Sequence, residues 1–245
     1  IFKSDLYLER LERSIIESVP APVAVIVSFP SNPTAQVVSL EFYEEVVKIA
    51  RKYSVYILSD LAYAEIYYDN SPPPSILQIP KAKEVAVEFT SMSKTYAMAG
   101  WRIGFAVGNK RLINALTRIK SYLDYGAFTP VQVAAAAALN GPQDCVKEIR
   151  NTYQKRRDVL INSMSRAGWN IPSPKASMFA WAPVPDKYKD KGSLEFAKEL
   201  MLKADVAVSP GVAFGEFGEG FVRVGLVENE QRIRQAAKNI KKLLL

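Results

Sequence analysis

Short apolar runs alternate with longer amphipathic segments through the first half of the chain. The apolar runs predict four short strands, at Val23–Ser28, Val55–Ser59, Val85–Phe89 and Ile103–Val107. Amphipathic spacing predicts a helix over Asp5–Ser18 and another that ends near Tyr53. Ser39 is a good N-cap for the second helix, whose expected apolar face is formed by Leu40, Val46, Val47 and Ala50. Strands that alternate with helices in this way indicate an α/β fold with a mostly parallel sheet.

The pattern becomes mainly helical after Lys110. Helices are predicted over Lys110–Leu123, Val131–Leu139 and from about Gln143 to Ala167, with Gly168 closing the last of them. Beyond this point the pattern predicts strands at 178–182, 206–209 and 221–224, and helices at 193–203 and from 228 onward. We therefore expect two domains, a larger one over residues 1–145 and a smaller α+β domain over residues 146–245.

Composition narrows the possible chemistry. The 245 residues are 49% hydrophobic, which suits a globular protein with a substantial core. Because Cys145 is the single cysteine and there is no histidine, a disulfide within the chain and every histidine-based triad or metal site are excluded. Proton transfer would have to fall to Lys, Tyr, Asp or Glu. No run resembles a signal peptide or a membrane span, so we expect a cytoplasmic protein without a membrane partner.

The formal charge of +7 does not by itself indicate a nucleic-acid partner, because the basic residues are spread over several predicted helices. We expect none. The basic run Lys155–Arg157 lies in a helical pattern, and we interpret it as a solvated face. The chain begins at Ile1, in the middle of a pattern, and is expected to be part of a longer protein.

The segment Ser91-Met-Ser-Lys94 is the strongest candidate for chemistry. A lysine just beyond an apolar strand and between hydroxyl residues is in an unusual place for a solvated charge, although that interpretation stays open. A lysine amine in partly apolar surroundings can form a Schiff base with a carbonyl compound. Ser91, Ser93 and Arg102 could bind a phosphate, with two hydroxyl donors and a guanidinium fork.

Asp60 and Tyr63 follow the second predicted strand. Asp60 is either the N-cap of a helix or a buried carboxylate that keeps a ring nitrogen protonated, so that the ring can accept electrons. Tyr63 is either a packed aromatic residue or a hydroxyl donor to the same ligand. Asp60, Asn32 and Ser91 each follow a predicted strand, and ligands in such sheets bind beyond the carboxyl ends of the strands.

Asn32 and Arg223 are two further candidates. Asn32 lies in Ser-Asn-Pro-Thr and is either a turn former or an amide donor to a phenolate oxygen. Arg223 lies in the apolar run Phe-Val-Arg-Val-Gly, where a buried arginine needs an acidic partner. A ligand carboxylate is a candidate for that partner. The glycine-rich segment 211–220 fits no phosphate-loop spacing, and we interpret it as a mobile turn.

Taken together, these residues resemble a known family. Order and spacing match the fold-type I (class I and II) aminotransferases, which use pyridoxal 5'-phosphate, from about Val23 to the end of the chain. The match rests on Asn32 in SNPT, Asp60 and Tyr63 in SDLAY, Ser91-x-Ser-Lys94, Arg102 in GWRIGF and Arg223 in FVRVG.

The resemblance implies a role for each residue. Lys94 looks like the lysine that holds the cofactor covalently and transfers protons, and Asp60 like the partner of the ring nitrogen. Asn32 and Tyr63 look like donors to the ring oxygen. The expected phosphate contacts are Ser91, Ser93 and Arg102. Arg223, with Asn32, would bind the substrate carboxylate.

The resemblance also implies substrates and assembly. Segments such as SFPSNPTA and PKASMFAWAPVP look most like glutamate–pyruvate (alanine-forming) aminotransferases, with LL-diaminopimelate and aspartate aminotransferases as alternatives. A pyridoxal-phosphate β-lyase and a catalytically dead interaction or regulatory domain also remain open. Family members carry a longer N-terminal part that completes the cofactor site, so the resemblance implies that this chain alone lacks part of the site and of the activity. The resemblance implies a homodimer in amino-acid biosynthesis.

Overall fold

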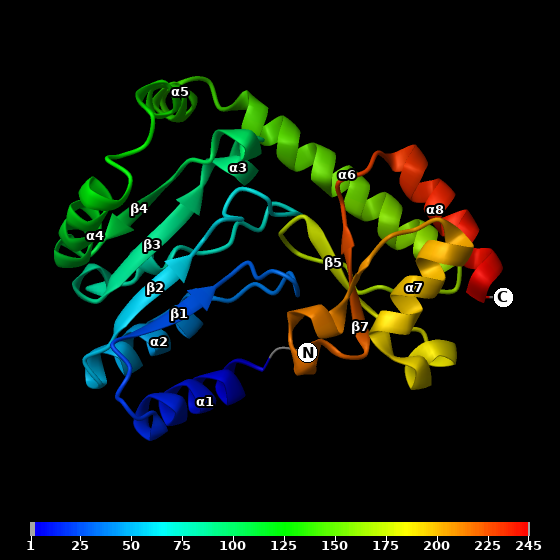
Figure 1. Ribbon diagram of the computed structural model, residues 1–245, viewed down its shortest axis with the longest axis horizontal. Helices are drawn as coiled ribbons and strands as arrows, with labels where there is room; N and C mark the ends of the chain where they lie inside the picture. Colours follow the sequence, from blue (N-terminus) through cyan, green and yellow to red (C-terminus); the bar gives the residue numbers. More distant parts are fainter. Residues whose placement is uncertain (1–2, 245) are drawn as a thin grey trace. The chain divides into compact units, whose positions relative to one another are not determined.

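The computed structural model describes residues 3–244, which fold into two compact units (Figure 1). Unit 1 contains most of the chain up to Ile149. Unit 2 contains the chain from Arg150 onward together with two short segments, Ser31–Ala35 and Ile66–Asn70, that interrupt unit 1 in sequence. In residues 3–244 no helix combines the length and the apolar character needed to cross a membrane.

Unit 1 contains a four-stranded sheet in the order β1-β2-β3-β4 (Figure 1). Its strands are β1 (Ala24–Ser28), β2 (Tyr56–Asp60), β3 (Ala86–Ser91) and β4 (Gly104–Gly108), which confirms the four predicted strands to within two residues. The first three strands are parallel, and β4 is antiparallel to β3. Because β2 and β3 are parallel, Asp60 and Ser91, their last residues, lie at the same edge of the sheet.

Two helices of unit 1, α1 (Ser4–Glu17) and α2 (Leu40–Lys52), share a core with the sheet. The Ser39 hydroxyl caps α2 by accepting a hydrogen bond from the Phe42 amide at 3.4 Å, as predicted. One expectation for α2 was wrong: Leu40 is 38% exposed. Phe42 and Tyr43 enter the core instead, because Leu40 is the first residue of the helix and lies beside the cap rather than over the sheet.

The rest of unit 1 is a series of short helices and turns. The α-helices are α3 (Met92–Thr95), α4 (Lys110–Leu123) and α5 (Thr129–Asn140), and the 3-10 turns are η1 (Ile76–Gln78), η2 (Ala82–Glu84) and η3 (Ala99–Trp101). Apolar side chains remain exposed here, including Tyr122 (75%) and Phe128 (74%).

Burial raises the pKa of the Glu88 carboxyl on β3, which accepts hydrogen bonds from the Ser75 hydroxyl and the Ile76 amide.

Unit 2 contains a three-stranded antiparallel sheet in the order β5-β7-β6. Its strands are β5 (Phe179–Pro183), β6 (Ser209–Pro210) and β7 (Phe221–Gly225). Of the predicted strand 206–209 only Ser209 pairs, with Arg223, and the observed strand continues instead to Pro210, which pairs with Val222. The helices are α6 (Asp144–Arg166), which begins in unit 1, α7 (Gly192–Ala204) and α8 (Glu230–Leu244), with 3-10 turns η4 (Asp186–Lys191), η5 (Gly211–Phe214) and η6 (Glu216–Gly218).

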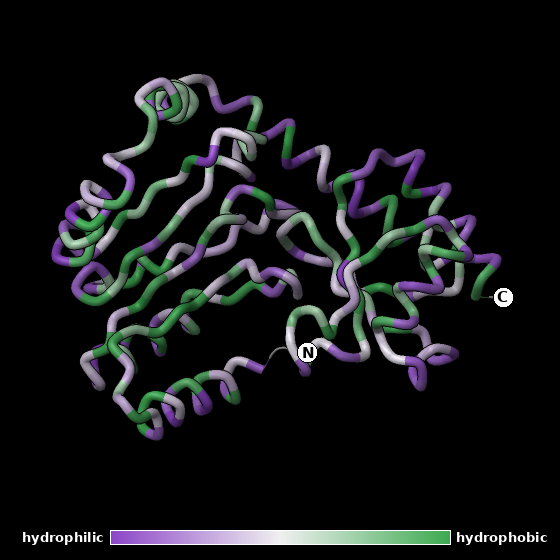
Figure 2. Tube along the Cα trace, in the orientation of Figure 1, coloured by the Kyte–Doolittle hydropathy of each residue, from purple (hydrophilic) through white to green (hydrophobic). Residues whose placement is uncertain are grey.

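The two faces of the unit 2 sheet have different side chains. One face carries Ala180, Ala182, Val222 and Val224, all of which are buried. The other face carries aromatic residues, and the rings of Trp181 and Phe221 stack across paired strands with centroids 5.4 Å apart. Figure 2 shows hydrophilic residues along α8, the last helix of this unit. The small residues of the first face leave room for the helices to approach the sheet closely.

The interpretation of Lys155–Arg157 as a solvated face was wrong. Arg157 is only 5% exposed, and its guanidinium makes two hydrogen bonds of 2.8 Å to the two carboxylate oxygens of Asp69. This contact holds the pKa of the Asp69 carboxyl below its usual range. Arg156 donates to the carbonyls of Leu226 and Val227. The run therefore joins distant segments of unit 2, and its periodicity gave no sign of these partners.

Candidate active site

Lys94 lies in the single turn of α3, which follows β3 without a break. Met92, Ser93 and Thr95 are buried, whereas Lys94 is half-buried. Its Nζ atom lies 5.9 Å from the centroid of the Tyr63 ring, and within residues 3–244 the amine has no hydrogen bond or ion pair. An amine beside an aromatic ring and without an acidic partner is available to react with a carbonyl compound.

Asp60 ends β2 at the same edge of the sheet. Its Oδ1 accepts a hydrogen bond from the Ala62 amide at 3.0 Å, and its Oδ2 accepts one from the Ser28 hydroxyl at 3.3 Å. The expectation of a buried carboxylate was wrong, since Asp60 is exposed, and the chain continues into a turn rather than a helix. Its carboxylate therefore keeps lone pairs free for another partner. Tyr63, only 8% exposed, is buried close by in sequence.

Hydroxyl residues flank Lys94 in sequence. Ser91 pairs with Gly104, and the Met92 amide donates to the Ile103 carbonyl at 3.2 Å, so the segment with Arg102 lies beside the segment with Ser91 and Ser93. Arg102 is exposed and donates through one guanidinium nitrogen to the Ala99 carbonyl at 3.0 Å, which leaves its other donors available.

Thr95 is a further hydroxyl that sequence reasoning missed. Its Oγ1 is buried and, within the described part of the chain, has no hydrogen-bond partner. A buried polar atom without a partner is unfavourable, and a ligand oxygen would relieve it. The signal was present as a third hydroxyl at alternate positions after Ser91 and Ser93. Hydroxyl donors, a guanidinium and an unpaired amine fit a phosphorylated aldehyde such as pyridoxal phosphate.

In unit 2, Arg223 is the centre of a second group of candidate residues. One of its terminal nitrogens donates to the Asn32 Oδ1 at 2.8 Å, and the other donates to the Ser209 hydroxyl at 3.2 Å. Its guanidinium carbon lies 4.3 Å from the ring centroid of Phe179 and 4.7 Å from that of Phe214. Arg223 is half-buried rather than buried, because it lies on the aromatic face of the sheet.

These contacts fix the plane of the Arg223 guanidinium. Two hydrogen bonds set its rotation and two aromatic rings limit its tilt, so the remaining N–H donors have a defined direction. Asn32 uses its carbonyl oxygen for Arg223, which leaves its NH2 group to donate elsewhere. The geometry is suited to binding a carboxylate, which accepts two parallel hydrogen bonds from a guanidinium.

The segment that carries Phe214 is closed by contact between two glycines. A Cβ atom on Gly211 would overlap the carbonyl oxygen of Gly218, and one on Gly218 would overlap the carbonyl oxygen of Gly211. Only glycine allows this approach of two backbones. The segment 211–220 contains two 3-10 turns, η5 and η6. Its glycines therefore serve the backbone contact that supports Phe214.

Comparisons with known proteins give one family and several relatives. The model of the family described as aminotransferase class I and II matches residues 4–240. The glutamate-pyruvate aminotransferase AlaC of Escherichia coli (strain K12) is 57% identical over 235 residues, which cover 96% of this chain and 57% of that protein. The LL-diaminopimelate aminotransferase of Moorella thermoacetica is 43% identical over 232 residues, covering 93% of this chain and 59% of that protein.

A solved structure has the same fold. The aromatic aminotransferase from Pyrococcus horikoshii OT3 matches with a TM-score of 0.88 and 27% identity, over 97% of this chain and 63% of that chain. The chain thus spans less than two thirds of the length of the proteins it matches.

Proposed function

The chain belongs to the class I and II aminotransferases, a family that depends on pyridoxal phosphate, and we propose that the complete protein moves an amino group between an amino acid and a 2-keto acid. The observation that carries the proposal is the half-buried Lys94 amine at the end of β3, which has no hydrogen bond or ion pair within residues 3–244 and is flanked in sequence by hydroxyl residues. A solvated surface lysine is not expected to lie in a turn whose neighbouring hydroxyl residues, Ser93 and Thr95, are buried.

Residues of unit 1 are proposed to hold the cofactor. Lys94 binds it covalently through its amine, and Ser91, Ser93 and Arg102 donate hydrogen bonds to its phosphate. Asp60 keeps the proton on the ring nitrogen, and Tyr63 donates to the ring oxygen. When bound, pyridoxal phosphate supplies an electrophilic carbon and a ring that accepts the electrons released at the substrate α-carbon.

Lys94 is also proposed to move protons. The Lys94 amine would remove the proton from the substrate α-carbon as a general base and would later return a proton as a general acid. The chain has no histidine that could compete for this role. Asp60 supports the step through its negative charge, since a carboxylate stabilises the positively charged ring.

Residues of unit 2 are proposed to bind the substrate. The fixed guanidinium of Arg223 donates two parallel hydrogen bonds to the α-carboxylate, which a lysine could not reproduce. Asn32 is assigned to both ligands: its carbonyl positions Arg223, and its NH2 group donates to the ring oxygen of the cofactor.

The proposed substrates are glutamate or alanine with pyruvate or 2-oxoglutarate. The chain is 57% identical to a glutamate-pyruvate aminotransferase and 43% identical to the LL-diaminopimelate aminotransferase of Moorella thermoacetica. The higher identity supports glutamate and alanine over LL-diaminopimelate as substrates. An aspartate aminotransferase is a further alternative, as is a β-lyase on the same scaffold. A catalytically dead domain is disfavoured by the retention of Lys94, Asp60 and Arg223.

We further propose that the protein is a cytoplasmic homodimer of amino-acid biosynthesis, without a nucleic-acid or membrane partner. We assign residues 1–145 to the large cofactor-binding domain and residues 146–245 to the small domain. The change from unit 1 to unit 2 after Ile149 supports this boundary.

The test is a panel of amino donors with the complete protein and pyridoxal phosphate. Each donor is assayed with pyruvate, with 2-oxoglutarate and without a keto acid. We expect glutamate with pyruvate to give alanine and 2-oxoglutarate, and no turnover without an acceptor. Release of ammonia and pyruvate without an acceptor would instead identify a β-lyase, and no turnover with any donor would contradict an enzymatic role.

A further inference from the structure

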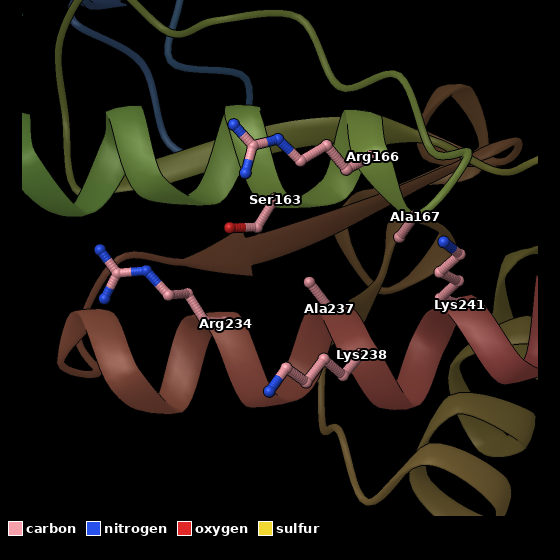
Figure 3. A pocket seen from close by; sticks show the side chains of 7 residues that line it. All are labelled: Ser163, Arg166, Ala167, Arg234, Ala237, Lys238 and Lys241. Carbon is pink, nitrogen blue, oxygen red and sulfur yellow. The ribbon is translucent and has the colours of Figure 1, made fainter.

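A groove between α6 and α8 contains none of the residues assigned to cofactor or substrate. It has a volume of about 290 Å³ and lies entirely within unit 2. Figure 3 shows Ser163 and Ala167 pointing from α6 toward α8, and Ala237 pointing back from α8. These three short side chains leave the space between the helices unfilled.

Four basic residues line the groove: Arg166 on α6, and Arg234, Lys238 and Lys241 on α8. The spacing i, i+4, i+7 places the three α8 residues on one side of that helix, over about 10 Å of its length. Arg234 and Lys241 extend toward α6 on either side of Ala237 (Figure 3). Among residues 3–244, no acidic side chain lines the groove.

The absence of ion pairs here contrasts with the neighbouring helix. Each lysine of α7, and Lys191 just before it, forms an ion pair. Lys191 and Lys203 both pair with Glu199, and Lys198 pairs with Glu195. Within residues 3–244, none of the four groove cations has an ion pair. An anion bound in this groove would be attracted by all four positive charges.

Helix termini explain only part of the pattern. Arg166 and Lys241 lie in the last turns of α6 and α8, where cations are favoured by the helix dipole. Arg234 and Lys238 lie in the first and middle parts of α8, where the dipole gives no such preference. Both nonetheless line the groove, so the helix dipole does not account for the whole set.

We propose that this groove binds a small anion with two or more phosphate groups. Two guanidinium forks and two ammonium groups match several phosphate oxygens, whereas a single carboxylate would leave most of them unused. The volume suits a small molecule rather than a protein segment. The inference does not depend on the proposed transamination, because no residue of the groove takes part in it.

The test measures binding of inorganic tripolyphosphate to the complete protein loaded with pyridoxal phosphate, so that the cofactor's own phosphate site is filled. Titration calorimetry at about 0.15 M salt limits weak surface attraction. We expect saturable binding of one tripolyphosphate per chain. The double variant Arg234→Gln/Lys238→Gln should weaken it by about tenfold or more, since each charged hydrogen bond contributes substantially.

The chain offers a matched control. Arg232→Gln/Lys242→Gln removes one arginine and one lysine from the same helix, but neither residue lines the groove. We expect less than about a twofold change in this variant. Equal weakening in both double variants, or no saturable binding to the unaltered protein, would overturn the proposal. Titrations with ADP and with pyrophosphate show whether the phosphate groups belong to a nucleotide or to a free polyphosphate. Tighter binding of ADP indicates a nucleotide, and equal binding of the two indicates a free polyphosphate.

Discussion

The two candidate groups differ in how tightly the protein holds their central cation. Arg223 in unit 2 has two hydrogen bonds and two aromatic rings around its guanidinium. Lys94 in unit 1 has a ring at 5.9 Å and, in the described chain, no hydrogen bond. The difference matches their proposed roles, because a group that only binds gains from being fixed, whereas a group that forms bonds and moves protons must change partners.

The loosely held amine gives the largest expected effect. Lys94→Ala should lower kcat at least about 10³-fold, because it removes both the covalent attachment and the proton transfer. Steady-state rates and the visible absorbance of the bound cofactor measure the two losses. Lys48→Ala, at an exposed site on α2, is the control and should retain both. An active Lys94→Ala variant would show that this amine is not the reacting group.

The next effect concerns the charge at the end of β2. Asp60→Asn should lower kcat by roughly 10²- to 10³-fold, the range for losing one well-placed electrostatic contact. The asparagine Oδ1 can still accept the hydrogen bond from Ala62, so the thermal midpoint should stay close to that of the unaltered protein. A kcat that does not change would mean that Asp60 only shapes the turn.

The fixed cation should respond differently. Arg223→Lys should raise KM for the amino acid by roughly 10- to 100-fold and change kcat less, since lysine cannot make two parallel hydrogen bonds to a carboxylate. The measurement is KM for donor and acceptor in separate half-reactions. If KM stayed the same for both, Arg223 would not be the carboxylate-binding residue.

The smallest effect tests whether the aromatic rings matter. Phe214→Leu should raise KM by about two- to fivefold, the loss of one cation–π contact, and Phe214→Tyr should restore it. Phe217→Leu is the matched control, three residues further along and 92% exposed. Equal changes at both positions would assign the effect to the loop as a whole. In that case the hydrogen bonds that Arg223 donates to Asn32 and Ser209 would suffice to hold it.

Local patterns predicted the elements well. The cap at Ser39, the bounds of α4 and the left-handed Gly168 after α6 follow from side-chain type and spacing within a few residues. The antiparallel direction of β4 was not predicted, because periodicity shows that a strand exists but not how it pairs. Nor could it show that Ser31–Ala35 and Ile66–Asn70 join unit 2.

For the candidate site, sequence identified the residues but not their surroundings. The position of Lys94 after β3 was predictable from a strand followed by hydroxyls. The exposure of Asp60 was not, because it depends on which face of the sheet this chain covers. The ion pair of Arg157 with Asp69, 88 residues away, has no local signal at all. Contacts between distant segments decide burial and charge pairing, and a single sequence does not contain them.

The hydrogen bond between Arg223 and Asn32 joins residues 191 positions apart, which has a consequence for how the protein is made. At a synthesis rate of about 5 to 20 residues per second, Asn32 leaves the ribosome roughly 10 to 40 seconds before Arg223. The β1–β2–β3 sheet can pair during that interval, whereas unit 2 must wait for its last strands. The carboxylate-binding group is therefore assembled only after Arg223 has been translated, and a product truncated before that residue would lack it.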